Sequence, residues 1–435
     1  MSDQTVIPAT AGHNAAKYGN GEALIIVRNA GTHDSRVLRE ARTLKSIGYR
    51  PEVIAVVSED EPRTEATIDG THITRLAPGS PLSWLRSRLR SGGEDERGDT
   101  IGADAPQASP ATPEAGSLRA LVVRIHRWLR TLDYYRRAIA LVRRERPALL
   151  HCNDYNTMWV GVAARLLGGT AVVYDAHELW PDRNLRPEPR WWLLACEALF
   201  VRCAHRTITA SPGYAEVIAR RYRVRPPQVI RNIPALAERT SPSDVPDGEP
   251  TFVYAGAVTR NRGIEVSIRA LARTPGARLR LLGPSSVAYR AELERLASGE
   301  GVSDRVEFAG AVPPGAVLES LRGATAGLAL IQPTCLSYEL SLPNKVFEYV
   351  LAGVPVLVSD LPVMGAFVDE QGVGLLARPD DASDVAAKLA ELMRPERNRE
   401  LRAGVVEAAA GLSWERESDL LGGTYTEALA AAHSG

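Results

Sequence analysis

The stretch from Ser337 to Ser359 restricts the possible fold more than any other part of the chain. It predicts a loop, a short helix, a turn and a strand, in that order. A proline suits the first turn of a helix, a glycine the end, and an apolar run a strand buried on both faces. These positions are Pro343, Gly353 and residues 354–358. The stretch therefore predicts an α/β fold with a parallel sheet.

The predicted helix begins with Asn344 and Lys345, and Glu348 follows one turn later. Free N–H groups and the helix dipole make such an N-terminus suitable for an anion. We expect a phosphate at this end of the helix. The carboxylate of Glu348 could accept hydrogen bonds from sugar hydroxyls just behind it.

This segment resembles the donor-binding motif of the retaining GT-B glycosyltransferases of family 4 (group 1 glycosyltransferases). Their pattern is two glutamates separated by seven residues, followed by a small-residue turn and a buried strand. Glu348 matches the second glutamate, but Glu339 is separated from it by eight residues and position 340 is Leu. The resemblance implies that Glu348 holds the nucleotide ribose and Glu339 a donor sugar hydroxyl. By itself the motif also fits an ordinary helix and strand.

Length and composition narrow the class of protein. A chain of 435 residues favours two domains. Lys plus Arg and Asp plus Glu are 52 each, so no charge bias favours nucleic acid. The four cysteines form no CxxC pair, which argues against a zinc site or a disulfide framework and favours a reducing cytosol. We expect residues 1–20 to be a disordered leader, and no apolar run suits a signal peptide or a membrane span.

Residues 21–233 predict a first α/β domain. A strand at 23–27, a helix ended by Gly48 and a strand at 53–57 form its opening, without the GxGxxG of dinucleotide-binding proteins. Either Thr32 or Asp34 would cap the helix. In the resembled family this first loop, which contains Gly31, faces the donor phosphates and the acceptor. Residues 78–117 are rich in Gly, Ser, Pro and Asp and predict a mobile insertion.

Two polar loops follow successive apolar strands of this domain, where ligands bind in open α/β sheets. The first loop holds Asn153 and Asp154, and the second holds Asp175, His177 and Glu178. The pair resembles the acceptor-side face of family 4. The resemblance implies that His177 lies near the reacting sugar and that Asp154 orients the acceptor or His177, with Asn153 and Glu178 on the acceptor side.

The helix predicted over 118–147 carries an apolar stripe and nine arginines against Asp133 and Glu145, a net charge of +7 with His126 neutral. One interpretation is a core helix with its stripe buried and a solvated polar face. The other is a basic amphipathic helix that touches anionic lipid headgroups. The helix at 190–204 carries three aromatic residues, which we expect in the core: Trp191, Trp192 and Phe200.

A proline-rich linker is expected at 234–250, followed by a second domain at 251–411. Its loop 257–263 resembles the phosphate loop of family 4, with Arg262-Gly263 in place of Lys-Gly. Ala257 stands where the family has Arg, and Arg260 could compensate. The resemblance also assigns donor contacts to Gly256, Gly283 and Ala309. The last segment, 412–435, resembles the family's final helix, which crosses back to the first domain.

Together these features predict two Rossmann-like parallel-sheet domains facing a cleft. The resemblance implies a glycosyltransferase that uses a nucleotide-diphospho-sugar as co-substrate, needs no cofactor and retains configuration, and the cysteine pattern leads us to expect a cytoplasmic protein. No DxD pair stands beside a strand end, so we expect Arg260, Arg262 and Lys345 to stabilise the diphosphate without a metal. The acceptor would be a glycan, a lipid-linked or a small molecule. A nucleotide-sugar 2-epimerase of the same fold and a catalytically silent GT-B binding subunit remain alternatives.

Overall fold

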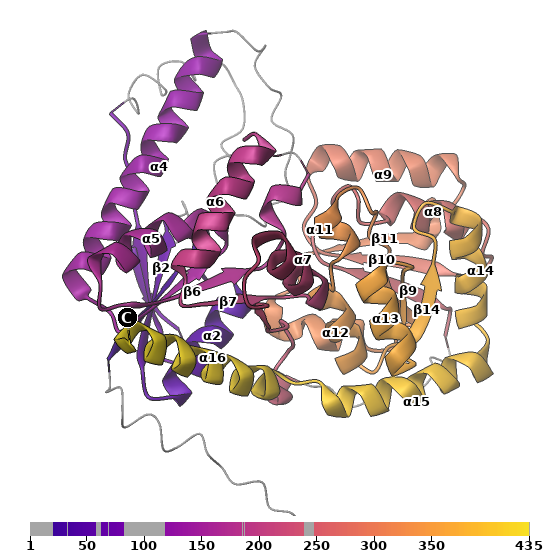
Figure 1. Ribbon diagram of the computed structural model, residues 1–435. Helices are drawn as coiled ribbons and strands as arrows, with labels where there is room; N and C mark the ends of the chain where they lie inside the picture. Colours follow the sequence, from indigo (N-terminus) through magenta and orange to yellow (C-terminus); the bar gives the residue numbers. More distant parts are fainter. Residues whose placement is uncertain are drawn as a thin grey trace, which may run out of the picture.

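A computed structural model describes residues 21–32, 34–57, 62–67, 69–81, 118–184, 186, 188–238 and 248–434. The predicted leader (1–20), most of the predicted insertion (78–117) and part of the predicted linker (234–250) lie outside these residues. The chain forms two α/β domains, each built around its own sheet (Figure 1).

The first sheet has eight strands in the order β3-β4-β2-β1-β5-β6-β7-β8. All neighbours are parallel except the β3–β4 pair. The strands are β1 (Glu22–Ile26), β2 (Arg50–Val56), β3 (Thr64–Ala66), β4 (His72–Leu76), β5 (Leu149–Asn153), β6 (Ala171–Ala176), β7 (Arg206–Thr209) and β8 (Gln228–Val229). The sequence analysis missed the edge strand β3 and its neighbour β4, which are short and rich in polar residues.

The second sheet has six parallel strands in the order β11-β10-β9-β12-β13-β14. They are β9 (Thr251–Ala255), β10 (Arg278–Leu282), β11 (Val306–Gly310), β12 (Ala326–Ala329), β13 (Val356–Ser359) and β14 (Gly374–Ala377). All four residues of β12 and of β13 are buried. The continuous apolar run seen in the sequence is thus a central strand covered by helices on both faces.

The helices cover both sheets (Figure 1). Those of the first domain are α2 (Ser35–Ser46), α4 (Leu118–Glu145), α5 (Met158–Leu167), α6 (Arg190–Cys203) and α7 (Pro212–Tyr222), with short 3-10 turns η1 (Tyr155–Thr157), η2 (Trp180–Asp182) and η3 (Leu236–Glu238). Those of the second are α8 (Ile264–Ala272), α9 (Val287–Gly299), α10 (Val317–Leu321), α11 (Leu336–Glu339), α12 (Asn344–Leu351), α13 (Pro362–Gln371), α14 (Ala382–Leu392) and α15 (Pro395–Gly411), with η4 (Ser303–Arg305) and η5 (Pro314–Ala316).

The last helix, α16 (Trp414–Ser434), returns to the first domain, as expected. It packs against α2, β6 and β7, whereas α15 packs against α12, α13 and α14 of the second domain (Figure 1). The buried side chains that anchor α16 include Leu421, Tyr425 and Leu429. Two consecutive helices, separated only by the non-helical residues Leu412 and Ser413, therefore tie the two domains together.

Two predicted apolar faces are only partly buried. In α4 the side chains of Tyr134, Ala138 and Val142 pack into the core of the first domain, but four earlier stripe residues are exposed: Leu121, Ile125, Trp128 and Leu132. In α6 Phe200 is buried as expected, but Trp191 and Trp192 are 69% and 46% exposed. The expectation of core positions for these two indoles was wrong. Among the described residues no helix is long and apolar enough to span a membrane.

Candidate active site

Two glycine turns meet at the carboxyl ends of β9 and β10. Gly256 has φ +121° and Gly283 has φ +148°, and a Cβ atom on Gly283 would lie 1.9 Å from the carbonyl oxygen of Gly256. A Cβ on Gly256 would lie 3.3 Å from the Nζ atom of Lys345. Backbone conformation and close approach therefore both require glycine here. The result is a turn with exposed backbone beside the ammonium group of Lys345.

Lys345 lies in the first turn of α12, with Nζ 3.6 Å from the centre of the Tyr254 ring. Burial, and then the nearby charge of Arg262, hold the pKa of Lys345 well below its usual value. The Arg262 guanidinium lies 4.9 Å from the centre of the Tyr338 ring. Across the described ranges of the chain, neither cation has an ion-pair partner. Two half-buried cations without ion-pair partners thus lie beside the exposed backbone of the glycine turn. Such an arrangement is suited to binding an anion.

Glu348 lies one turn behind Lys345 and is half-buried. Burial raises its pKa, while the charges of Lys345 and Arg39 oppose that change. Arg39 belongs to α2, so Glu348 lies where the second domain faces the first. Asn344 is exposed as the first residue of α12. Pro343 is the residue before the helix rather than in its first turn, because its ψ of 147° is extended.

Three other predicted donor residues, Arg260, Ala309 and Glu339, have different surroundings. Arg260 is exposed, pairs with Glu292 at 2.5 Å and lies over the Tyr289 ring, so it is held against α9. Ala309 is exposed near the end of β11. Glu339 is half-buried at the end of α11.

In the first domain, His177 and Asp175 form a close pair. His177 Nε2 lies 2.7 Å from Asp175 Oδ2, on the loop that follows β6. Although burial opposes the positive charge, Asp175 raises the pKa of His177 to about 10. Burial likewise opposes ionisation of Asp175, but Arg36 and His177 hold its pKa well below the usual range. At neutral pH the pair is therefore an imidazolium and a carboxylate.

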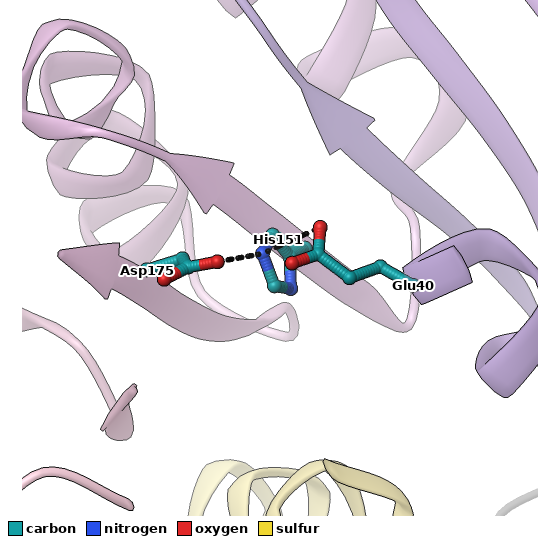
Figure 2. A group of neighbouring side chains, drawn as sticks. All are labelled: Glu40, His151 and Asp175. Atoms are coloured by element: carbon teal, nitrogen blue, oxygen red, sulfur yellow. Dashed lines mark ion pairs between the residues drawn. The ribbon is translucent and has the colours of Figure 1, made fainter. Parts of the chain in front are cut away.

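Asp175 belongs to a larger buried cluster, part of which is drawn in Figure 2. Arg36 Nε lies 2.8 Å from Asp175 and 2.9 Å from Glu40. His151 Nε2 lies 3.3 Å from Glu40 and 3.6 Å from Asp175. Burial raises the pKa of Glu40 to about 7, against the attraction of His151.

Glu40, His151 and Asp175 could in principle hold a metal, because their ligand atoms lie within 4.8 Å of one another. However, Arg36 already provides a positive charge to both carboxylates, and its Nη1 donates to the carbonyl oxygen of Ile230 at 2.8 Å. We therefore interpret the three residues as members of an ion-pair cluster.

The other predicted acceptor-side residues surround this cluster. Asn153 is buried and its Nδ2 donates to Glu40 at 3.3 Å, so it faces the interior. Asp154 is partly buried and has φ +66°, an unusual value for an aspartate. Glu178 pairs with Arg183. Gly31 is buried with φ +80°, and a Cβ there would lie 3.3 Å from Ala55.

Contacts between the domains bring the two predicted halves of the site together. Tyr214 Oη donates to the Ser337 carbonyl oxygen at 2.6 Å, and Ser211 Oγ donates to that of Leu340 at 2.6 Å. These contacts hold α11, which carries Glu339, against the first domain. Helix α11 also packs against η2, at the end of the loop that contains His177 and Glu178. The structure thus places the His177 loop next to the segment that leads into Lys345.

The sequence analysis missed four members of the buried cluster: Arg36, Glu40, His151 and Tyr425. Arg36 and Glu40 are one helical turn apart and flank the apolar face of α2, a spacing typical of ion pairs. That spacing could have suggested an ion pair. However, a sequence does not distinguish a buried ion pair from one on the surface. Nothing in the sequence indicates that Tyr425, in the last helix, contacts His151.

The comparisons with known proteins agree for both domains. The family model described as "Glycosyl transferases group 1" matches residues 249–395, and that described as "Glycosyltransferase Family 4" matches residues 96–234. The D-inositol 3-phosphate glycosyltransferase of Saccharomonospora viridis is 28% identical over 311 residues, covering 65% of this chain and 70% of that protein. Its counterpart from Acidothermus cellulolyticus is 27% identical over 310 residues, covering 65% and 67%.

Solved structures show the same fold. The sucrose-phosphate synthase of Thermosynechococcus elongatus has a TM-score of 0.73 at 20% identity, covering 94% of this chain and 99% of that one. The Anabaena protein HepE in complex with UDP-glucose has a TM-score of 0.61 at 14% identity, covering 93% and 99%. Both domains thus resemble the glycosyltransferases of group 1 and family 4, the predicted GT-B fold is confirmed, and the chain is a glycosyltransferase.

Proposed function

We propose that the protein transfers a sugar from a nucleotide-diphospho-sugar to a hydroxyl group of an acceptor, with retention of configuration. One observation carries this proposal: Lys345 and Arg262 are half-buried cations without ion-pair partners in the described residues, beside the backbone turn of Gly256 and Gly283. A bound diphosphate would provide the negative charge that Lys345 and Arg262 lack as a partner.

In the proposed reaction the bond between the anomeric carbon and the diphosphate oxygen breaks, and a bond to the acceptor oxygen forms. Lys345 and Arg262 stabilise the charge that develops on the departing diphosphate, so no metal is required. Glu348 accepts hydrogen bonds from the nucleotide ribose, and Glu339 from a hydroxyl of the donor sugar. Gly256, Gly283, Ala309 and Asn344 contribute backbone and short side chains around the nucleotide.

His177 has a different part in the proposed reaction. Because its pKa is raised to about 10, it is already protonated at neutral pH and cannot act as a base. We assign it the role of a hydrogen-bond donor to the reacting sugar, with Asp154 nearby to orient the acceptor. The proton of the acceptor hydroxyl then passes to an oxygen of the departing diphosphate, which retains the negative charge able to accept it.

The substrates of similar proteins support a nucleotide sugar. Solved structures of HepE hold UDP, and one holds UDP-glucose, while the curated relatives are named for D-inositol 3-phosphate. For this chain we propose a nucleotide sugar as donor and a hydroxylated acceptor, either free or linked to a glycan or lipid. The residues that would select among acceptors lie in loops, which vary most between relatives of one fold.

We further propose that the enzyme binds reversibly to an anionic membrane through α4. Leu121, Ile125, Trp128 and Leu132 are exposed along this helix, and the exposed arginines Arg124 and Arg127 lie between them. Exposed apolar side chains interspersed with arginine suit the boundary between headgroups and acyl chains. The exposed indoles of Trp191 and Trp192 in α6 add to the apolar surface of this domain.

Incubation of the full chain with a panel of nucleotide sugars and simple acceptors, in chelator, tests the proposal. Nucleotide diphosphate released together with a new glycoside supports it. Diphosphate released with a free 2-epimer identifies an epimerase, and nucleotide binding without turnover identifies a silent subunit. A requirement for added magnesium or manganese would contradict the role given to the two cations. The variant Lys345→Met should no longer release nucleotide diphosphate. The control variant Lys388→Met, in α14, should release it as the natural protein does.

A further inference from the structure

We propose that Tyr425 of α16 is a positioning residue for His177, acting through His151, Glu40 and Asp175. This inference rests on the proposed function for its kinetic consequence, but its structural content concerns contacts inside the first domain. It assigns the returning helix a part in the chemistry, beyond joining the two domains.

The contact that carries the inference joins the last helix to the middle of the first sheet. Tyr425 Oη lies 2.9 Å from His151 Nδ1, and the two rings meet edge to face with centroids 5.7 Å apart. Both side chains are fully buried. A buried hydroxyl that contacts a buried imidazole is costly unless both are satisfied, so this contact has a definite geometry.

The contact determines which nitrogen of His151 carries the hydrogen. His151 Nε2 faces carboxylate oxygens of Glu40 and Asp175, at 3.3 and 3.6 Å. Carboxylates accept hydrogen bonds, so we infer that Nε2 carries the hydrogen of the ring. Nδ1 then carries the lone pair and accepts the hydrogen of Tyr425. Without the hydroxyl, the ring can change tautomer and turn its other lone pair toward the carboxylates, which would repel it.

The carboxylates in turn fix His177. Asp175 Oδ2 receives both Arg36 Nε at 2.8 Å and His177 Nε2 at 2.7 Å, while Arg36 also holds Glu40 at 2.9 Å. A shift of Glu40 or Asp175 therefore changes the charge beside His177 and the direction in which its ring points. Because these groups are buried in one network, a change at Tyr425 reaches His177 even though the two residues belong to different elements.

Tyr425→Phe tests this inference, because it removes only the hydroxyl and keeps the ring that fills the core. Tyr222→Phe is the matched control: Tyr222 is also buried in the first domain, and its hydroxyl donates to the buried carboxylate of Glu197 at 2.6 Å. Within the part of the chain that the structure describes, Tyr222 makes no hydrogen bond to any residue of the His177 cluster. Each full-length variant is compared with the natural protein in steady-state kinetics and in an NMR pH titration of the histidine rings. The His177 signal is assigned by its loss in His177→Gln.

We expect Tyr425→Phe to lower kcat about 10- to 100-fold while KM for the donor stays within about twofold, since misplacement at a reacting centre has costs of that size. We also expect its His177 signal to titrate at a different pH. Tyr222→Phe should leave both unchanged. If the two variants behave alike, or if His177 titrates as in the natural protein, the inference is wrong.

The NMR titration does not depend on turnover. If no donor supports transfer, the proposed function is wrong. A changed titration pH of His177 in Tyr425→Phe would still support the network of contacts. If Tyr425→Phe does not fold, Glu40→Gln provides the second test. It keeps the size of the side chain and removes the charge that His151 Nε2 faces, so the same displacement of the His177 titration is expected. An unchanged titration in that variant would equally overturn the inference.

Discussion

The ammonium nitrogen of Lys345 lies 3.6 Å from the centre of the Tyr254 ring and has no carboxylate within ion-pair distance among the described residues. An unpaired half-buried lysine with a lowered pKa is an unusual arrangement, and it suggests that an anionic ligand completes the site.

The first prediction concerns proton uptake on nucleotide binding. Burial and Arg262 lower the pKa of Lys345 in the free protein, and a bound diphosphate would raise it again. Binding of a nucleoside diphosphate at about pH 8, where the lysines of model peptides are charged, should therefore take up a proton. Calorimetric titration in two buffers of different ionisation enthalpy measures this uptake. Lys345→Met should abolish it, and equal heats in both buffers for the natural protein would contradict it.

The second prediction separates donor binding from catalysis. Arg262→Ala and Glu348→Gln should each weaken donor binding. Replacing Arg262 should weaken the free energy of donor binding by about 1.5–3 kcal/mol, the usual contribution of a hydrogen bond to a charged group. His177→Ala should bind the donor as before but turn over more slowly. Direct binding and steady-state rates measured on the same variants check both statements.

Arg260→Ala is the matched control for Arg262→Ala, because Arg260 pairs with Glu292 and lies over Tyr289. It should change donor affinity less. A larger loss for Arg260 than for Arg262 would mean that Arg260 leaves α9 when the donor binds. Unchanged turnover in His177→Ala would remove His177 from the reacting centre.

The third prediction is a pH dependence of stability that depends on His177. Its pKa is raised to about 10 in the folded protein, so its stabilising contribution is complete below about pH 6.5, the value for an unfolded histidine. That contribution should be lost as pH rises from about 6.5 to 10, and we expect it to be on the order of 1.5–3 kcal/mol, typical of charged hydrogen bonds. Chemical unfolding across this range measures the loss.

Two variants isolate the contribution of His177. His177→Gln should show a flatter fall in stability above pH 7. Glu40 also has a raised pKa, of about 7, so its part in the fall should be confined to about pH 4.5–7. Glu40→Gln should therefore keep the fall above pH 7. A natural protein whose stability does not change between pH 7 and 10 would show that His177 is not held by Asp175.

The fourth prediction is that the protein pellets with anionic vesicles and much less with neutral ones. Because Trp128 is 66% exposed, part of the binding should persist at physiological salt, which screens the arginines of α4. Trp128→Ser should weaken this residual binding. Val287→Ser, at an exposed apolar position on α9 of the second domain, should not. Failure to pellet with anionic vesicles even at low salt would exclude the membrane contact and leave the enzymatic proposal unaffected.

The sequence by itself determined the order of the helices and strands and several residues of the proposed donor-binding site. Apolar runs of strand length, such as residues 354–358, have few alternatives to a buried parallel strand, and Gly353 and Pro355 mark the end of the helix before them. Lys345, Glu348 and Gly256 could be named because they stand at fixed positions relative to such elements. Their local geometry follows from neighbours in the chain.

Only the tertiary structure decided which polar residues meet. Arg36, His151, Asp175 and Tyr425 come from α2, β5, β6 and α16, and their contacts depend on how the last helix packs across the first sheet. Periodicity also could not decide the exposure of α4, since Val142 of the predicted stripe is buried whereas Leu121, Ile125, Trp128 and Leu132 of the same stripe are exposed. Local patterns determine elements, but burial and pairing depend on which surfaces a fold brings together over long separations in sequence.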